Sequence, residues 1–254
     1  MPEGIIRFKF FKKNELKYLS HLDILTMLSR AFARAGIKCV YSCGFNPKPR
    51  VSLSNPIPLG VESLAEYCDI ELAENMDAKE FLKIVNKQLP ENLKITDSIN
   101  ADPKTPSLMS EIGLVLYDFQ VTSIACQDMK KITPESYSSF EKSFEETLAG
   151  GIKPGPGFKE GDFSINTGPI HSFEFIFSKT STGGSILLKI YGYAKIFKNK
   201  NNSIFKFNEF SGKLKEILRE YGLKIISAQK TEVFIIIDSG LVNPLEILKF
   251  KKRD

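Results

Sequence analysis

Residues 20–66 read SHLDILTMLSRAFARAGIKCVYSCGFNPKPRVSLSNPIPLGVESLAE. The stretch opens with a helix signal, because Ser20 precedes an apolar periodic run and Asp23 follows three residues later, as in a capping box. Leucine, phenylalanine and alanine then recur at helical spacing as far as Gly36, a residue typical of the position after a helix. The sequence therefore predicts a helix that begins at Ser20 and stops at Gly36.

A short strand over residues 38–42 and a long loop over residues 43–63 are expected next. The loop is rich in Gly, Pro, Asn and Ser. A loop of this length inside an ordered domain is usually functional. We therefore expect the functional site in this stretch.

The elements around the loop follow the order strand–helix–strand–strand–helix–strand. Alternating apolar residues predict further strands, and an amphipathic run with Asp77 as its cap predicts a second helix. These elements are expected at residues 5–11, 67–72 and 94–99 for the strands and 77–89 for the helix. This order is that of the split βαβ, ferredoxin-like unit, an antiparallel sheet with both helices on one face.

The second half of the chain repeats this order more loosely. Its strands are expected near residues 114–124, 170–177, 185–194 and 223–237, its helices at 134–148 and 207–221, and a Gly-Pro lid or contact loop at 150–161. We therefore predict an α+β fold of two tandem ferredoxin-like units. The predicted domains are residues 1–104 and 112–254, joined by a polar connection.

Composition places the chain among ordinary soluble globular proteins, because 42% of its 254 residues are hydrophobic and 26% are charged. No apolar run approaches the roughly 18 residues of a membrane-spanning helix. The first residues lack the pattern of a signal peptide, so we expect a cytoplasmic protein. The four cysteines form no CxxC pair and are expected to be reduced packing residues, with no metal or cofactor bound by this chain.

The net charge of +5 is unevenly distributed. Residues 1–50 hold ten Lys and Arg against three Asp and Glu, and residues 189–254 hold fourteen against seven. Residues 62–102 reverse this, with ten acids against four lysines. Basic segments at both ends suit a polyanion such as RNA, although lysines scattered over a solvated surface would give the same counts.

His21 is one of two histidines and lies one residue past the expected N-cap. The positive end of the helix dipole favours a neutral imidazole there. A neutral ring could act as a general base or hydrogen-bond a ligand, or it could make a structural hydrogen bond to the loop. Asp23 lies two positions on and does not face His21 on a helix, so the two residues do not form a catalytic dyad.

Arg30 and Arg34 are i,i+4 neighbours on the predicted helix. Two guanidinium groups at this spacing could clamp a phosphate, which their planar forks bind well. The alternative is that they pair with Glu62 or Glu66, carboxylates supplied by the same stretch.

Residues 45–50, Phe-Asn-Pro-Lys-Pro-Arg, combine an aromatic ring, an amide and two cations on a semi-rigid backbone. Such a set could stack a base and hold a phosphate, although prolines also simply stiffen loops. The sequence contains no nucleophile elbow, HExxH motif, Walker motif or metal-ligand spacing. It therefore predicts no firm catalytic set, and His21 would be catalytic only in an RNA-processing enzyme.

Four ordered blocks, SHLD, RAFARAG, YSCGFNPKP and PLGVESLAEY, resemble the radical-SAM-linked family known as domain of unknown function 2344. The resemblance covers roughly residues 5–100. Members of that family occur alone or as the C-terminal part of cobalamin-binding-type radical S-adenosylmethionine proteins. The family's motif positions fall here on Ser20, His21, Asp23, Arg30, Arg34, Tyr41, Ser42, Gly44, Phe45, Asn46, Pro47, Pro49, Gly60, Glu62, Ser63 and Glu66.

The resemblance implies a bacterial cytoplasmic accessory module that acts with a radical SAM protein on RNA or a ribosome-related substrate. The CxxxCxxC signature of a radical enzyme is absent from this sequence, so an iron–sulfur cluster and S-adenosylmethionine would belong to the partner chain. Two positions depart from the family's pattern, since Lys48 stands where it often has His and Thr26 where it often has Arg. If that histidine is catalytic, this chain lacks it.

Three hypotheses follow. The first is a non-catalytic module that binds RNA or presents a substrate through a cleft formed by residues 20–66. The second is a metal-independent RNA-processing enzyme with His21 as its base, and the third is a protein-interaction scaffold that docks through the same stretch. The expected binding residues are His21, Arg30, Arg34, Tyr41, Ser42, Phe45, Asn46, Lys48, Arg50 and Glu62.

Overall fold

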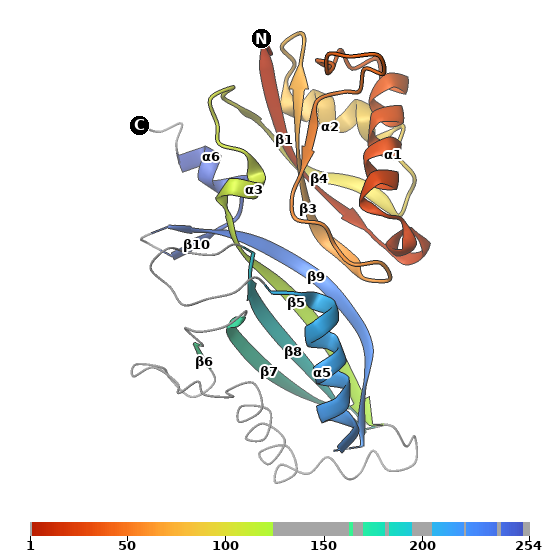
Figure 1. The fold of residues 1–254 in the computed structure, drawn as a ribbon, viewed down its shortest axis with the longest axis vertical. Helices are drawn as coiled ribbons and strands as arrows, with labels where there is room; N and C mark the ends of the chain where they lie inside the picture. The colour runs from red at the N-terminus through yellow and green to blue at the C-terminus, as the bar shows by residue number, and fades with distance from the viewer. Residues whose placement is uncertain are drawn as a thin grey trace. The chain divides into compact units, whose positions relative to one another are not determined.

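The computed structural model describes residues 2–123, 163–164, 170–180, 183–194, 205–220, 222–237 and 240–250. It has a mixed α/β architecture with a mostly antiparallel sheet and helices (Figure 1). The helix expected at residues 134–148 and the loop expected at 150–161 lie outside the described residues. Among the described helices, none is long and apolar enough to cross a membrane.

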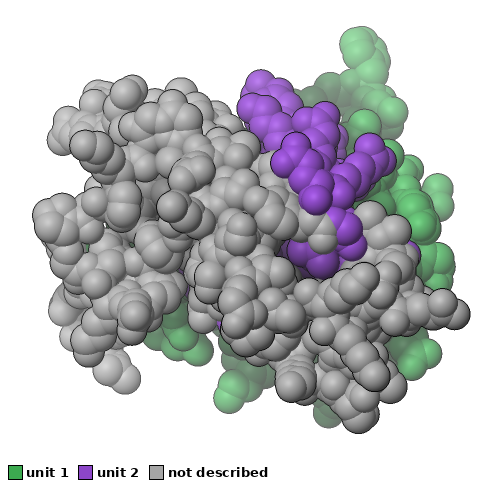
Figure 2. All heavy atoms as spheres, turned by 90° about the horizontal axis from the view of Figure 1, so that it is seen from below, with its two compact units in different colours: residues 1–113, 230–254 green, residues 114–229 purple. Residues whose placement is uncertain are grey.

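Two compact units divide the chain. Unit 1 consists of Met1–Gly113 together with Lys230–Asp254, and unit 2 of Leu114–Gln229; Figure 2 colours them green and purple. The predicted domains, residues 1–104 and 112–254, differ from these units because the last 25 residues group with the first unit. Hydrogen bonds from Arg7 to Pro244 and from Lys230 to Glu66 give the physical reason.

Unit 1 is organised on strands that pair antiparallel. The strands are β1 (Gly4–Lys12), β2 (Val51–Leu53), β3 (Glu62–Leu72), β4 (Leu93–Ala101), β9 (Leu223–Ile237, from its eighth residue on) and β10 (Gly240–Val242). The order is β4-β1-β3-β9, with β2 on β3 and β10 on β9. The central register places Arg7 opposite Asp69 and Phe8 opposite Cys68.

Helix α1 (His21–Arg34) begins with the predicted capping box. The Ser20 hydroxyl accepts a hydrogen bond from the Asp23 N–H at 3.2 Å, and the Asp23 carboxylate accepts one from the Ser20 N–H at 2.9 Å. Gly36 follows the helix with a φ of 72°, in the left-handed region where glycine is favoured. Both predicted ends of this helix are confirmed.

Helix α2 (Ala78–Asn86) is capped by Asp77, whose carboxylate accepts hydrogen bonds from the N–H groups of the second and third helical residues. Shorter helices in unit 1 are η1 (Asn14–Tyr18), α3 (Leu108–Glu111) and α6 (Glu246–Phe250).

One face of the unit 1 sheet is covered by both long helices. Phe8 of β1 lies 6.1 Å from Phe32 of α1 and 5.5 Å from Phe81 of α2, measured between ring centroids. Ile6 and Phe10, the alternate residues of β1, are also completely buried in this cluster. Because strand side chains alternate between faces, Arg7 belongs to the other face.

That second face is covered as well. Ile5 and Ile99, from β1 and β4, pack against a small apolar cluster that includes Ile247 and Leu248 of α6. The C-terminal residues therefore shield the side of the sheet on which Arg7 lies, and Arg7 has no exposed surface.

The strand expected at residues 38–42 is wrong. Only isolated bridges occur there, from Cys39 to Leu72 and from Tyr41 to Pro49, and the regular strand β2 falls inside the expected loop. The Val40 N–H donates to the carbonyl of Glu71 and not to that of Arg50, so the pairing of Tyr41 with Pro49 stays a single bridge.

Unit 2 contains β5 (Ile112–Ser123, from its third residue on), β6 (Phe163–Ser164), β7 (Ile170–Thr180), β8 (Gly183–Tyr193) and helix α5 (Phe207–Glu220). Its strand order is β5-β8-β7-β6, and β8 pairs antiparallel with both β5 and β7. Phe207 and Phe210 of α5 contact Phe119 of β5, with ring centroids 5.5 and 5.6 Å apart.

Candidate functional site

Residues 40–50 form a projecting hairpin, which we call the hairpin arm. The Arg50 N–H donates to the Val40 carbonyl and the Ser42 N–H to the Lys48 carbonyl, both at 2.8 Å. At its tip Gly44 has a φ of 127°, which only glycine adopts readily. The arm is joined to β3, because the Val40 N–H donates to the carbonyl of Glu71 and the Glu71 N–H to that of Arg50. The Gly- and Pro-rich segment is therefore ordered and not a free loop.

An open cavity of about 440 Å³ lies beside the arm, and we call it the hairpin cavity. The arm, β2, β3 and the connection after β4 all contribute to its walls. Its lining residues are Ile5, Ser42, Lys48, Pro49, Arg50, Val51, Ser52, Asp69, Glu71, Pro103, Thr105 and Ser107. This volume is within the range of small-molecule sites.

The charged side chains that line the hairpin cavity differ in whether they have an ion-pair partner. Arg50 lies 2.8 Å from a carboxylate oxygen of Glu71, and Arg7 holds both carboxylate oxygens of Asp69 at 2.8 and 2.9 Å. Within the described part of the chain, no side chain forms an ion pair or hydrogen bond with the Lys48 ammonium. Lys48 is therefore the cation in this cavity that is open to an incoming anion.

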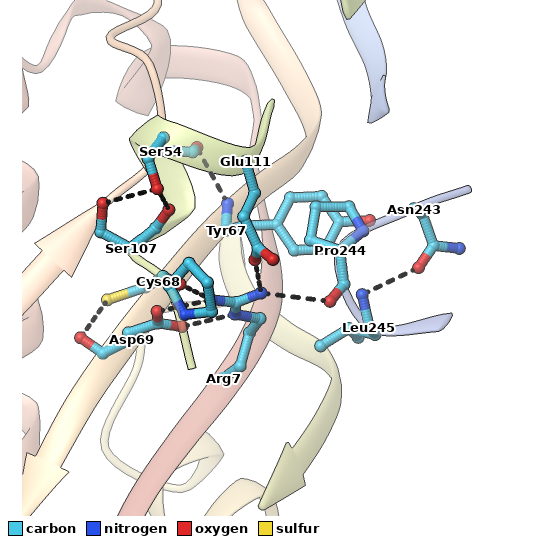
Figure 3. Close-up of polar contacts among 12 residues, drawn as sticks. Arg7, Ser54, Tyr67, Cys68, Asp69, Ser107, Glu111, Asn243, Pro244 and Leu245 are labelled. Atoms are coloured by element: carbon cyan, nitrogen blue, oxygen red, sulfur yellow. Dashed lines mark hydrogen bonds and ion pairs between the residues drawn. The ribbon is translucent and has the colours of Figure 1, made fainter. Parts of the chain in front are cut away.

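Arg7 is completely buried and is held in a network of hydrogen bonds (Figure 3). Besides Asp69, its guanidinium donates to Glu111 at 3.0 Å and to the carbonyls of Pro106 and Pro244 at 3.1 and 3.5 Å. Burial raises the pKa of Asp69, and the hydrogen bonds from Arg7 act in the opposite direction. The network fixes one wall of the hairpin cavity.

His21 lies at a different place. It lines a second cavity with Lys12 and Glu66, whose volume of about 10 Å³ has room for one water at most. Lys12 and Glu66 are both buried, as is Lys230, whose ammonium donates to Glu66 at 2.9 Å. Burial lowers the pKa of Lys12; Glu66 opposes this effect and Lys230 adds to it.

Asp23 has the role of a cap. Hydrogen bonds from the Ser20 hydroxyl and N–H lower the pKa of its carboxyl group. This geometry fits the expectation that Asp23 and His21 are not a catalytic dyad.

The predicted site residues are not gathered in one cavity. Ser42, Lys48 and Arg50 line the hairpin cavity, and His21 lines the second one. The remaining members line neither of these two cavities; they are Arg30, Arg34, Tyr41, Phe45, Asn46 and Glu62. These two cavities are separate and do not form the single cleft that was expected across residues 20–66.

In the described part of the chain, neither helix arginine forms the expected alternative pair with Glu62 or Glu66. Arg34 donates to the Gln88 carbonyl at 2.7 Å, and Arg30 is exposed. Glu66 pairs with Lys230, and Glu62 accepts a hydrogen bond from the Asn14 N–H at 2.9 Å.

Sequence reasoning did not indicate that the ionic residues Arg7, Lys12, Glu66 and Lys230 are buried, or that Asp69 pairs with Arg7. Alternation along β1 places Arg7 on the sheet face opposite the helices. In an antiparallel sheet with helices on one face only, that face is exposed to solvent, so this alternation by itself predicts an exposed Arg7. No local pattern indicated that residues 230–250 cover that face. In the described part of the chain, no three residues among His, Cys, Asp and Glu come together as a set of metal ligands.

Residues 6–150, more than half of the chain, match the family described as uncharacterized protein conserved in bacteria (DUF2344). The chain belongs to this family. The DUF2344 match covers the hairpin arm and every residue that lines the hairpin cavity except Ile5. No match was found among curated proteins.

Among solved structures, the chain is similar to one from the archaeal box H/ACA sRNP Nop10-Cbf5 complex, with a TM-score of 0.38 and 7% identity. The similarity covers 89% of this chain and 46% of that one, so the DUF2344 protein spans about half its length.

Proposed function

We propose that this DUF2344 protein is a non-catalytic module that binds single-stranded RNA through the hairpin arm and its cavity. The observation that carries the proposal is the ammonium of Lys48, which has no side-chain partner among the described residues, at a cavity large enough for a nucleotide. The hydroxyl-bearing residues Ser42, Ser52 and Thr105 line the same cavity and offer further hydrogen bonds to a phosphate or ribose.

The exposed aromatic residues of the arm support the same function. Phe45 at the tip is fully exposed, and Tyr41 is half exposed. Proteins that bind single strands combine a positively charged groove with aromatic rings on which bases stack, and each stacked base contributes about 1–3 kcal/mol. Lys48, Arg50 and these two rings lie on one short hairpin.

A separate radical S-adenosylmethionine enzyme is the proposed partner. This partnership rests on the resemblance of the SHLD and GFNPKP blocks to the radical-SAM-linked proteins. The partner would carry the iron–sulfur cluster and S-adenosylmethionine, and the module would bind RNA or present a ribosome-related substrate in the cytoplasm.

We also propose that each predicted domain is a ferredoxin-like unit. For the first, the support is the order β4-β1-β3 with β2 beside β3, and the packing of α1 and α2 against the same apolar residues of β1. For the second, the support is the succession of strands and helices in the sequence.

A His21-dependent RNA-processing enzyme has less support from the geometry. The cavity beside His21 is too small for a nucleotide. His21 and Arg30 are nine positions apart on the helix, which is about 13 Å along the axis, so the two cannot hold one phosphate. Incubation of the wild type and His21→Ala with RNA tests this alternative, which requires cleavage by the wild type alone.

A protein-interaction scaffold is favoured by a different observation. Three large apolar side chains near the start of α1 and before β3 are mostly exposed: Tyr18, Leu22 and Leu59. If this function is the correct one, Leu22→Ser abolishes capture of a radical enzyme while Lys48→Ala does not.

RNA binding is tested by fluorescence anisotropy with a labelled single-stranded RNA at several salt concentrations. Lys48→Ala is expected to weaken binding and to reduce the slope of affinity against salt by about one phosphate contact. Lys79→Ala is the matched control, because Lys79 is an exposed lysine of unit 1 outside the cavity. Equal effects of the two variants, or no binding by the wild type, would refute the function.

A further inference from the structure

We propose that the hairpin cavity holds one nucleotide of the RNA by both of its phosphates, with Lys48 on one side and Lys104 on the other. This inference rests on the proposed RNA-binding function and goes beyond it by adding a second phosphate site. It also names the part of the RNA that the cavity takes, which is a nucleotide inside the strand and not one at its end.

Strand pairing places the hairpin arm and the connection after β4 on opposite sides of the cavity. Ile5 of β1 pairs with Ala101 of β4 and with Glu71 of β3. The Glu71 N–H in turn donates to the Arg50 carbonyl of the arm. Neighbouring strands lie about 4.8 Å apart, so the three steps from Ala101 to Arg50 span about 14 Å. Ile5 and Glu71, which lie between these two ends, both line the cavity, so a ligand above them meets a different wall on each side.

A hydrogen-bonded turn forms the wall after β4. The Thr105 N–H donates to the Asp102 carbonyl at 2.8 Å, which closes a β-turn with Pro103 in its second position, where proline is favoured. The Asp102 carboxylate also accepts a hydrogen bond from the Lys104 N–H at 2.7 Å, as in an Asx-turn. Lys104 is therefore held by an ordered turn between two residues that line the cavity, Pro103 and Thr105.

The side chain of Lys104 is available to a ligand. It is exposed, and its ammonium has no ion pair or hydrogen bond with any residue that the structure describes. Lys48 has the same property on the arm. The two carboxylates that line the cavity, Asp69 and Glu71, are each paired with an arginine. A phosphate that binds either lysine therefore breaks no ion pair.

Two cations on opposite walls match a nucleotide inside a strand. Such a nucleotide has a phosphate on each side of its ribose, whereas a nucleotide at an unphosphorylated end has only one. Lysine carries a compact charge with three donors on a flexible four-carbon stem, so each ammonium can meet a phosphate above the cavity floor. The hydroxyl groups of Ser52 and Thr105 line the space between and can hydrogen-bond the ribose.

The first test measures the salt dependence of binding. The full chain is titrated into a labelled uridine nonamer at several salt concentrations and followed by fluorescence anisotropy. Lys48→Ala and Lys104→Ala are each expected to reduce the slope of log affinity against log salt by about 0.7, the value of one phosphate contact on a single strand, and the double variant by about 1.4. Lys79→Ala, which alters an exposed lysine of α2 outside the cavity, is the matched control and is expected to keep the wild-type slope.

The second test separates the two phosphate sites. Uridine 3′,5′-bisphosphate, uridine 5′-monophosphate and uridine 3′-monophosphate each compete with the labelled nonamer for the wild type and both single variants. The bisphosphate is expected to bind the wild type more tightly than either monophosphate. Because each lysine meets a different phosphate, Lys48→Ala and Lys104→Ala are expected to weaken different monophosphates.

The outcomes separate this inference from the function on which it rests. If Lys48→Ala lowers the slope and Lys104→Ala behaves as Lys79→Ala does, RNA binding stands and the second phosphate site is overturned. Equal binding of the bisphosphate and the monophosphates, or loss of the same monophosphate in both variants, also overturns it. If the wild type does not bind the nonamer, the proposed function fails as well. Should a variant not fold, the comparison of the three nucleotides on the wild type still decides.

Discussion

Replacement of Arg7 by methionine is expected to remove a large fraction of the stability of unit 1. Methionine keeps the unbranched apolar stem but removes the guanidinium and its hydrogen bonds. Two carboxylates, Asp69 and Glu111, would then remain close together with side chains only 14% and 11% exposed and without their cation.

The size of the loss in unfolding free energy follows from this geometry. Removal of one partner of a buried ion pair costs about 3–5 kcal/mol, because an uncompensated charge remains in the interior. The bidentate contact with Asp69, at 2.8 and 2.9 Å, places Arg7→Met in the upper part of that range. A typical domain has about 5–15 kcal/mol of unfolding free energy, so the loss is a large fraction of the total.

The deficit of Arg7→Met should depend on pH with a definite sign. Burial already raises the pKa of Asp69, and without the Arg7 hydrogen bonds that pKa rises further. A carboxyl group whose folded pKa exceeds its unfolded value binds a proton more tightly in the native state. The deficit is therefore largest above the folded pKa and shrinks as the pH falls through it.

Urea unfolding followed by circular dichroism measures this effect, since the chain contains no tryptophan for fluorescence. The comparison is made at about pH 8 and about pH 5, above the usual pKa of an aspartate. Arg30→Met is the matched control, because Arg30 is exposed, and it should change the unfolding free energy by less than about 0.5 kcal/mol. A deficit below about 1 kcal/mol, or one that grows as the pH falls, would refute the reasoning.

Three further predictions concern other residues of unit 1. Burial, opposed by Glu66, lowers the pKa of Lys12, so wild-type stability should rise as the pH increases through the folded pKa of this lysine toward its unfolded value. Lys12→Met should lack that rise in urea titrations and be at least as stable as the wild type at neutral pH; lower stability would contradict the account. Ser20→Ala should lose about 0.5–2 kcal/mol in the same assay through the missing N-cap, and an unchanged unfolding midpoint would contradict the role of the cap. Burial raises the pKa of Cys39 to about 11, so about one thiol in a thousand is ionised at pH 8, and exposed Cys43 should be alkylated before Cys39 in a mass-spectrometric time course.

Local signals in the sequence predicted local structure well. The Ser20 and Asp23 capping box, the stop at Gly36 and the Asp77 cap are all present, because each depends on residues within one helical turn. Where pairing partners are distant, prediction was weaker. The chain after Cys39 leaves β3 to build the hairpin arm, and nothing near that residue indicates the departure.

The site shows the same limit. The loop composition indicated the arm that carries Ser42, Lys48 and Arg50, but the opposite wall comes from Asp69, Glu71 and residues 103–107. The buried pair of Glu66 and Lys230 joins residues 164 positions apart. Helical and strand periodicities describe single elements, so they do not report which distant segments meet.

The discontinuity of unit 1 has a consequence for the order of events during synthesis. The Pro244 carbonyl that accepts from Arg7 is made 237 residues after it. At about 5–20 residues per second, the first segment waits roughly 12–50 s on the ribosome before its final partner exists. During that interval the nascent sheet has one uncovered face, on which the side chain of Arg7 remains in contact with water.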